Sequence, residues 1–213
     1  TEIEDFIKEV LDHIQGVLFL HPQTGLWTLK LIRNDYSYAS LRVLDSTNSV
    51  ARNRQRKAAG ELVNEVIISY KDYKTEGDKT ITFQDLGSIA QIGQVVSSKR
   101  EYYGVRSDRL ANIIGARDIR AASYPLFSCE IEADRSFRDA TPGSVFKLTV
   151  PEDGISEMAV RVLKVDYGKP KDRRIRMSVV EDIFALTKTD YTVVQDSEWE
   201  SPDQPPTPMA FKR

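Results

Sequence analysis

The stretch "LFSCEIEAD" (126–134) alternates between apolar and polar residues from its second position onward. Successive side chains of a β-strand point to opposite faces, so this alternation predicts a strand with one apolar and one polar face. The apolar face carries Phe127, Cys129, Ile131 and Ala133. The polar face carries Ser128, Glu130, Glu132 and Asp134. We expect the first face to lie in a core and the second to meet solvent or an interface.

Three further strands are predicted downstream, around residues 144–150, 158–167 and 174–182. Short loops that contain Pro, Gly or Asp separate these strands. In the first loop, Pro142 and Gly143 set the backbone of a turn and serine follows them. Strands at this spacing are typical of an antiparallel barrel or sandwich, and not of a parallel sheet with crossover helices.

A helix is predicted just upstream, over "SDRLANIIGARDIRAASYP" (107–125). It begins at a Ser107 or Asp108 cap. It ends near Tyr124, because Pro125 disfavours the α region for the residue before it.

The N-terminal stretch "TEIEDFIKEVLDHIQG" (1–16) predicts a second main helix, since its apolar residues recur at helical spacing. Thr1 and Glu4 match a capping box, and Gly16 supplies the stop. Two β-rich runs then flank "HPQTG" (21–25), which has the length and glycine content of a hairpin loop. We expect the helix to pack on this hairpin.

The middle of the chain is less regular. The basic stretch 51–61 is predicted to be a loop and "LVNEVIISYKDY" (62–73) a strand. A short strand near Ile81, a short helix over 83–93 and a strand through Val95 and Val96 follow.

The predicted fold is therefore α+β, with strand-dominated antiparallel barrel or sandwich modules and two main helices. The expected divisions are a helix-plus-hairpin module (1–75), a helix-bearing barrel module (76–187) and a Pro-rich acidic linker or docking arm (188–213). Because the chain begins at Thr1 without methionine and ends in a Pro-rich segment, we expect it to be a piece of something longer.

The composition of the chain limits the classes of function and partner that are expected. The 30 basic and 32 acidic residues give a net charge of -2, which creates no global field for nucleic acid or an anionic membrane. One cysteine excludes an internal disulfide. Two histidines and one cysteine cannot build a closed zinc site without heavy use of carboxylates, so no structural metal is expected. No stretch approaches the length of a membrane span, and the first twenty residues lack the pattern of a signal peptide. No cofactor is expected.

Few residues suggest catalysis. His13 and His21 are isolated histidines, for which a structural role is favoured, and Cys129 is expected to be buried and inert. Glu130 and Glu132 lie roughly 7 Å apart on one side of a strand, a separation that could suit glycosidase carboxylates. Nothing evident would raise the pKa of either one, so a solvated strand face is favoured. A cell-wall hydrolase remains an alternative.

Two groups of basic residues remain. Arg52, Arg54, Arg56 and Lys57 cluster in the predicted loop, where a solvated surface is favoured over a phosphate or partner contact. Four arginines of the helix predicted around 107–125 project within an arc of about 80°. This basic stripe consists of Arg106, Arg109, Arg117 and Arg120. Ion pairing is favoured for it, because no aromatic residues interleave with it to stack on bases. A nucleic-acid-binding module is the second alternative.

The order of the segments resembles the phage tail proteins that form the central hub, or tip, of long-tailed phages and related prophage particles. The resemblance runs from the first helix to "VEDIFAL" (180–186) and extends to the trailing "PPTP" (205–208). It is carried by 16–36, 62–73, 82–105, 116–155, 158–168 and 175–186. One departure is Ser144, which stands where members often have an acid, so an ion pair made by that acid is in doubt.

The resemblance implies a structural, non-enzymatic virion component without cofactors or catalytic residues. Such a component forms a homotrimeric ring at the distal end of the tail tube, partly from β-barrel domains. The implied partners are other copies of the chain, the tail tube, the tape-measure protein and other tip proteins, with DNA only in transit through the channel. The resemblance also implies that the protein is assembled in the bacterial cytoplasm and ends at the tail tip of the virion. The basic stripe is then a candidate for an interface or a channel-facing surface.

Overall fold

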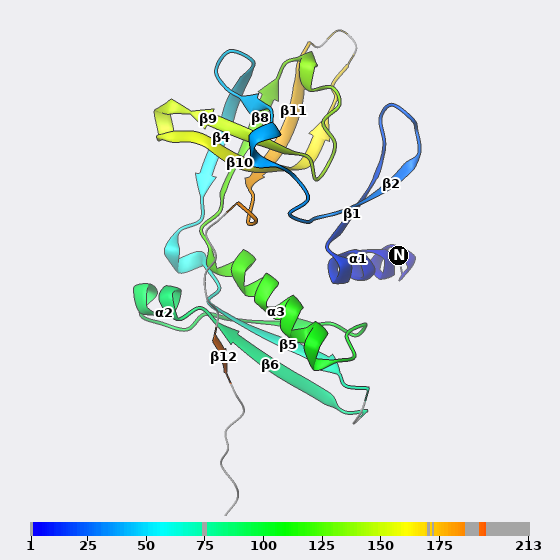
Figure 1. Ribbon diagram of the computed structural model, residues 1–213, viewed down its shortest axis with the longest axis vertical. Coiled ribbons are helices and arrows are strands. Elements are labelled where there is room, and N and C mark those ends of the chain that lie inside the picture. The colour runs from blue at the N-terminus through cyan, green and yellow to red at the C-terminus, as the bar shows by residue number, and fades with distance from the viewer. Residues whose placement is uncertain (1, 74–75, 170, 172, 186–191, 195–213) are drawn as a thin grey trace, which may run out of the picture.

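The computed structural model describes residues 2–73, 76–169, 171, 173–185 and 192–194, which form an α+β fold rich in strands (Figure 1). The first elements are the helix α1 (Glu2–Ile14) and the hairpin β1 (Gly16–Leu20) and β2 (Trp27–Leu31). Short 3-10 helices occur at Tyr38–Ser40, Ala59–Glu61, Arg135–Phe137 and Pro151–Asp153. Within the described ranges, no helix is long and apolar enough to cross a membrane.

A six-stranded sheet curls into a half-barrel in the order β3-β9-β10-β11-β8-β4 (Figure 1). Its strands are β3 (Val43–Leu44), β4 (Ser49–Arg56), β8 (Phe127–Ala133), β9 (Val145–Val150), β10 (Ile155–Asp166) and β11 (Ile175–Glu181). All neighbours are antiparallel except β3 and β9. The concave core includes Ile131, Leu148 and Met177, each no more than 1% exposed. The predicted α+β, strand-dominated fold class is confirmed.

The second sheet has four strands in the order β12-β6-β5-β7, and α3 (Asp108–Ser123) covers one of its faces. This sheet together with α3 is called the four-stranded layer. Its strands are β5 (Glu65–Lys71), β6 (Asp78–Gln84), β7 (Ser97–Glu101) and β12 (Thr192–Val194). Val66, Ile68 and Phe83 of the sheet pack against Ile114 and Ile119 of the helix. The short helix α2 (Leu86–Ile92) connects β6 to β7.

Glycine permits the close approach of α3 to this sheet. Gly115 is buried on the inner face of α3, and a Cβ added to it would lie 1.9 Å from Cε2 of Phe83. The ring of Phe83 is itself only 1% exposed. Only a residue without a side chain fits between the helix backbone and this ring.

The chain crosses three times between the half-barrel and the four-stranded sheet. The crossings connect β4 to β5, α3 to β8, and β11 to β12. The boundary expected at residue 75 falls between β5 and β6, which pair along seven positions, and β12 lies within the expected linker. We therefore propose that the two structural units are the half-barrel and the four-stranded sheet, each built from segments that are distant in the sequence.

The basic stretch 51–61 was predicted to be a loop, which is wrong for its first half, because β4 extends to Arg56. β4 is an edge strand with few apolar residues, and its stability comes from pairing with β8. Arg52 stands opposite Glu130 in the register and forms an ion pair with Glu132 at 3.4 Å. Charged residues are common on edge strands because they discourage pairing with other chains.

The local signals around α3 predicted its limits well. Ser107 is the N-cap and its hydroxyl accepts a hydrogen bond from the backbone N–H of Leu110. The helix ends at Ser123, and Tyr124 before the proline is extended, with φ -96° and ψ 134°. The strand expected through Val95 and Val96 begins at Ser97 instead. Thr1 of the predicted capping box lies outside the described residues.

Candidate functional site

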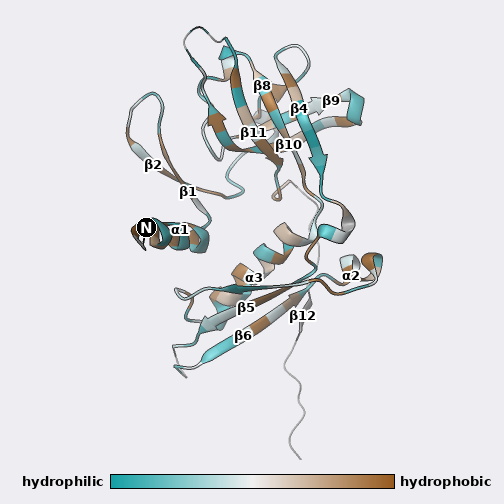
Figure 2. Cartoon of the chain, turned by 180° about the vertical axis from the view of Figure 1, so that it is seen from behind, coloured by the Kyte–Doolittle hydropathy of each residue, from teal (hydrophilic) through white to brown (hydrophobic). Residues whose placement is uncertain are grey.

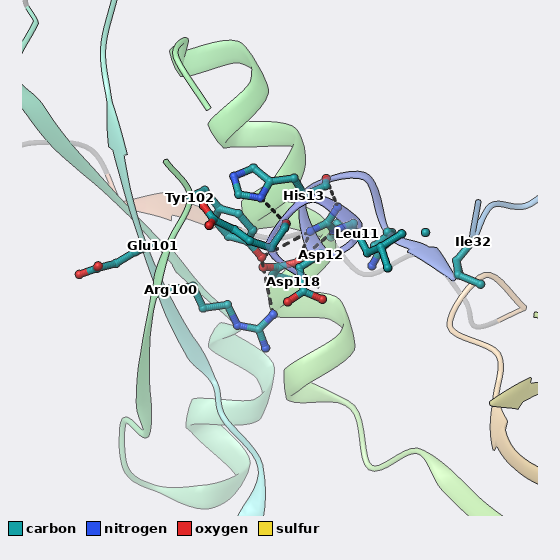
Figure 3. A pocket seen from close by; sticks show the side chains of 12 residues that line it. Leu11, Asp12, His13, Ile32, Arg100, Glu101, Tyr102 and Asp118 are labelled. Carbon is teal, nitrogen blue, oxygen red and sulfur yellow. Dashed lines mark hydrogen bonds and ion pairs between the residues drawn. The ribbon is translucent and has the colours of Figure 1, made fainter. Parts of the chain in front are cut away.

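A buried carboxylate organises the space between α1, α3 and β7 (Figure 3). Asp118 of α3 is 2% exposed and accepts hydrogen bonds from Arg100, Arg117 and the hydroxyl of Tyr102. The Nη1 atom of Arg100 lies 3.1 Å from the carboxylate, and Nε of Arg117 lies 2.9 Å from it. Burial raises the pKa of Tyr102, and its hydrogen bond to Asp118 raises it further. Two guanidinium groups thus neutralise one buried charge.

His13 fastens the end of α1 to this cluster. The backbone N–H of Gly104 donates to Nε2 of His13 at 3.0 Å, so the ring proton is on Nδ1, which donates to the carbonyl of Glu9. The imidazole meets the ring of Tyr102 edge to face at 5.1 Å. These groups line a cavity of about 490 Å³. His13, expected to be structural, positions α1 in this arrangement.

A second buried ion pair ties the segment after the hairpin to the half-barrel. Arg161 and Asp182 are 5% and 2% exposed and lie 3.0 Å apart. Arg161 also donates to the carbonyls of Gly143 and Arg33, and Tyr36 donates to Asp182 at 2.5 Å. Burial raises the pKa of Tyr36, and the hydrogen bond to Asp182 adds to that shift. The two buried charges are thus paired with each other, and partly buried Tyr36 and two backbone carbonyls complete their hydrogen bonds.

Pro142 and Gly143 occupy the centre of a tight turn next to this ion pair. The N–H of Ser144 donates to the carbonyl of Thr141 at 2.9 Å, and Gly143 has φ 81°, as a type II turn requires. The hydroxyl of Ser144 accepts from the N–H of Thr141 at 3.2 Å, so serine bonds locally here. Lys30 of the hairpin lies against Gly143. Burial lowers the pKa of Lys30, and nearby Arg161 lowers it further.

The outer face of β8 is covered by ion pairs. Glu132 lies 3.4 Å from a guanidinium nitrogen of each of three arginines, which are Arg52, Arg174 and Arg176. The carboxylate of Glu130 accepts from Nδ2 of Asn53 at 2.8 Å. The two glutamates are thus held by basic or amide partners, an arrangement typical of a structural surface.

The basic residues of β4 pair in the same way. Arg54 lies 3.0 Å from both Glu152 and Asp153, and Arg56 lies 3.5 Å from Glu181. Lys57, which follows β4, is exposed. The two arginines therefore connect β4 to the 3-10 helix Pro151–Asp153 and to the end of β11.

Residues 2–165 match the family model described as "Putative phage tail protein". The chain belongs to this family. The resemblance that was drawn from the order of its segments is therefore confirmed. A search of the curated proteins found no match.

Solved structures share the fold of this tail protein. A chain in the virion of a native gene transfer agent particle matches with a TM-score of 0.64 and 13% identity, over 86% of this chain and 40% of that one. The tail protein from Neisseria meningitidis MC58 matches with 0.52 and 9%, over 81% and 53%. The 43 kDa tail protein of prophage MuSo2 from Shewanella oneidensis matches with 0.51 and 11%, over 86% and 56%. The tail protein thus spans about half the length of these chains.

The four arginines of the predicted stripe differ in their surroundings. Arg106 precedes the first residue of α3, so the helical arc does not include it. Arg109 is exposed near the start of the helix. Arg117 is 17% exposed and bonds Asp118, and Arg120 is partly buried. The exposed part of the stripe therefore consists of Arg106 and Arg109.

Sequence reasoning missed both buried ion pairs of the tail protein. Asp118 lies on the inner side of α3, close to Ile114 and Ile119, so a charge on an apolar helix face was the available signal. Arg161 stands between Val160 and Val162 in a buried strand. A charged residue inside such a run was the corresponding signal there.

The thiol of Cys129 is expected to react slowly in the folded tail protein. Burial raises its pKa to about 12, so the reactive thiolate is scarce near neutral pH. Labelling with Ellman's reagent at pH 8 should be at least ~100-fold slower in the native protein than in denaturant. A Cys129→Ser variant that also carries Ser46→Cys, in an exposed turn, should label rapidly in both states. Rapid native labelling of Cys129 would contradict the burial.

The thiol of Cys129 also makes the stability of the folded protein fall as the pH rises. Its pKa in the folded state is raised above the ordinary value of 9.0. Its contribution to stability is therefore full below pH 9 and is lost as the pH rises toward 12.

Proposed function

We propose that this tail protein is a passive structural component of the tail tip. In this proposal its copies form a homotrimeric hub ring at the distal end of the tail tube, which connects the tube to host-recognition parts and lets DNA pass. The observation that carries the proposal is the match of residues 2–165 to the tail protein family. The fold shared with the tail proteins from Neisseria meningitidis and Shewanella oneidensis supports it.

The ion pairs of the half-barrel support a structural role. The pair of Arg161 and Asp182 is buried, and the carboxylate of Glu132 lies among three arginines on the outer face. A hydrolase of the glycosidase type needs one carboxylic acid that holds a proton and one free carboxylate. Here Glu132 lies 3.4 Å from a guanidinium nitrogen of each of three arginines, and Glu130 accepts a hydrogen bond from Asn53, so both carboxylates are engaged by partners within the chain. We propose that the protein has no enzymatic activity.

Location in the particle is the most direct test of the structural role. Particles carrying an epitope tag on this protein should bind gold-labelled antibody at the distal end of the tail tube in electron micrographs. Untagged particles provide the control. Gold along the whole tube or on the head would contradict the tip assignment.

The catalytic alternative has its own test. Purified protein should leave cell-wall material intact in a clearing assay, as should the Glu130→Gln variant. Clearing by the wild type that disappears in Glu130→Gln would contradict the non-enzymatic proposal.

The oligomeric state of the purified protein tests the proposed homotrimeric ring. Light scattering should give three times the chain mass of 24.2 kDa at high protein concentration. A mass equal to one chain at every concentration would contradict the homotrimer, whereas gold at the tail tip would still support the structural role.

A further inference from the structure

The N-terminal arm, defined as α1 with β1 and β2, carries a large exposed apolar face. In both views it stands to the side of the two sheets (Figures 1 and 2). The helix contributes Ile3, Phe6, Ile7 and Val10, which are 39–75% exposed. The hairpin contributes Leu18, Leu20, Trp27, Leu29 and Leu31, which are 39–72% exposed. Contiguous apolar surfaces of this kind mark sites of interaction.

The apolar residues of the hairpin share one face of its two strands. Leu18 pairs with Leu29 and Leu20 pairs with Trp27 across the antiparallel register. Directly paired residues lie on the same face of a sheet. The opposite face is mixed, with Val17 paired with Lys30 and Phe19 paired with Thr28. One side of the hairpin is therefore apolar throughout.

Gly16 joins the apolar side of α1 to that of the hairpin. A Cβ at Gly16 would lie 3.1 Å from Cδ1 of Ile14 and 3.1 Å from Cδ1 of Leu29. Ile14 follows Ile7 and Val10 along one side of α1. Because Ile14 and Leu29 both lie next to Gly16, the apolar side of the helix leads into that of the hairpin.

The outer face of α3, defined as Arg109, Leu110 and Ile113, is a second exposed surface with apolar residues. Leu110 is 50% exposed and Ile113 is 58% exposed. Arg106, also exposed, lies two residues before the first residue of the helix, Asp108, which is exposed as well. This region therefore combines two large aliphatic side chains with two cations and one acid.

The two surfaces have opposite charge. The sequence of α1 contains five acidic residues and one lysine. The outer face of α3 and the turn before the helix carry Arg106 and Arg109 against one exposed acid, Asp108. Complementary potentials guide association and select the correct partner.

The arm does not cover the α3 outer face of its own chain. Its base is held by the bond from Gly104 to His13 and by Nη1 of Arg117, which donates to the carbonyl of His13 at 3.4 Å. Nη2 of Arg33 also donates to the carbonyl of Ile14 at 2.9 Å. With the base held in this way, both surfaces remain exposed in the single chain.

We propose that the arm of one subunit docks on the α3 outer face of a second copy of this chain. The inference rests on the proposed homotrimer and assigns its contact. Each subunit carries one arm and one acceptor face, so the contact is heterologous, and a heterologous contact closes into a ring when its rotation fits. Phe6 and Trp27 are the aromatic anchors of the arm.

Two variants that block opposite sides of the contact test the proposal. Trp27→Asp disables the arm and leaves the acceptor face intact, whereas Ile113→Asp disables the acceptor face and leaves the arm intact. Each is expected to weaken self-association at least ~30-fold in light scattering over a concentration series, as loss of an interface anchor does. Leu163→Asp, at a 58% exposed position of β10, is the matched control and should associate like the wild type. Circular dichroism should show that all three are folded.

Mixing the two variants distinguishes the proposed contact between the arm and α3 from other modes of self-association. The intact arm of Ile113→Asp should bind the intact acceptor face of Trp27→Asp, so the mixture should contain particles of two chain masses that neither variant forms alone. A mixture that stays monomeric would overturn the proposal, and so would an Ile113→Asp variant that associates normally. A wild-type trimer that both variants preserve would also overturn it and leave the hub function standing. A monomeric wild type would refute both the trimer and the docking contact, with the tail-tip role still judged by gold labelling.

Discussion

Replacing Asp182 with alanine is expected to lower the free energy of unfolding by about 3 to 5 kcal/mol. Arg161 and Asp182 are 5% and 2% exposed, so the variant would leave a guanidinium group buried without its partner charge. Tyr36 would also lose the acceptor of its hydrogen bond. Urea unfolding followed by circular dichroism measures the change.

An exposed ion pair provides the control. Arg42 and Asp139 lie 2.8 Å apart, but their side chains are 43% and 58% exposed. Asp139→Ala should therefore cost no more than about 1 kcal/mol. Equal losses in the two variants would show that burial of the Arg161 pair has no energetic weight. Arg161→Met combined with Asp182→Leu should recover much of the stability, because it removes both charges together.

The same site makes stability depend on alkaline pH. Burial and the hydrogen bond to Asp182 raise the pKa of Tyr36 above its ordinary value of 10.0. A raised pKa in the folded state contributes stability that is complete below pH 10 and is lost as the pH rises further. In Asp182→Ala this alkaline loss should be smaller, because one cause of the shift is absent.

Gly115→Ala is expected to destabilise the four-stranded layer by about 3 kcal/mol, at the upper end for overpacked cores. The new methyl group would lie 1.9 Å from the ring of Phe83, which is 1% exposed and enclosed by the layer. The higher helix propensity of alanine, about 1 kcal/mol, offsets only part of this strain. Thermal and urea unfolding should both show the loss.

Two further variants sharpen this prediction. Gly60→Ala places its methyl group in open space and should change stability by less than about 0.5 kcal/mol. Phe83→Leu combined with Gly115→Ala should be more stable than the sum of the single changes indicates, because the smaller side chain makes room. Additive losses would mean that the ring is not the obstacle.

Local signals explain which parts of the fold were predictable. The alternation in β8 and the cap and proline that bound α3 act within a few residues, and each gave the correct element. β4 was missed because its charged residues become a strand only through pairing with β8, some 75 positions away. The parallel pair β5 and β7 likewise depends on a contact between separate segments.

The interactions of the candidate site also depend on contacts between residues that are distant in the sequence. A helical projection placed Arg117 beside Arg120, but it could not show that Arg100 and Tyr102 of another element would converge on Asp118. The pair of Arg161 and Asp182 joins β10 to the residue that follows β11, and Tyr36 donates to Asp182 from 146 positions away in the sequence. Such partners are brought together only by the tertiary fold.

The three crossings between the two sheets have a mechanical consequence. A pulling force applied to one sheet reaches the other through three chain segments in parallel, which connect β4 to β5, α3 to β8, and β11 to β12. Cutting the chain at any one crossing would therefore leave the two sheets covalently connected through the other two.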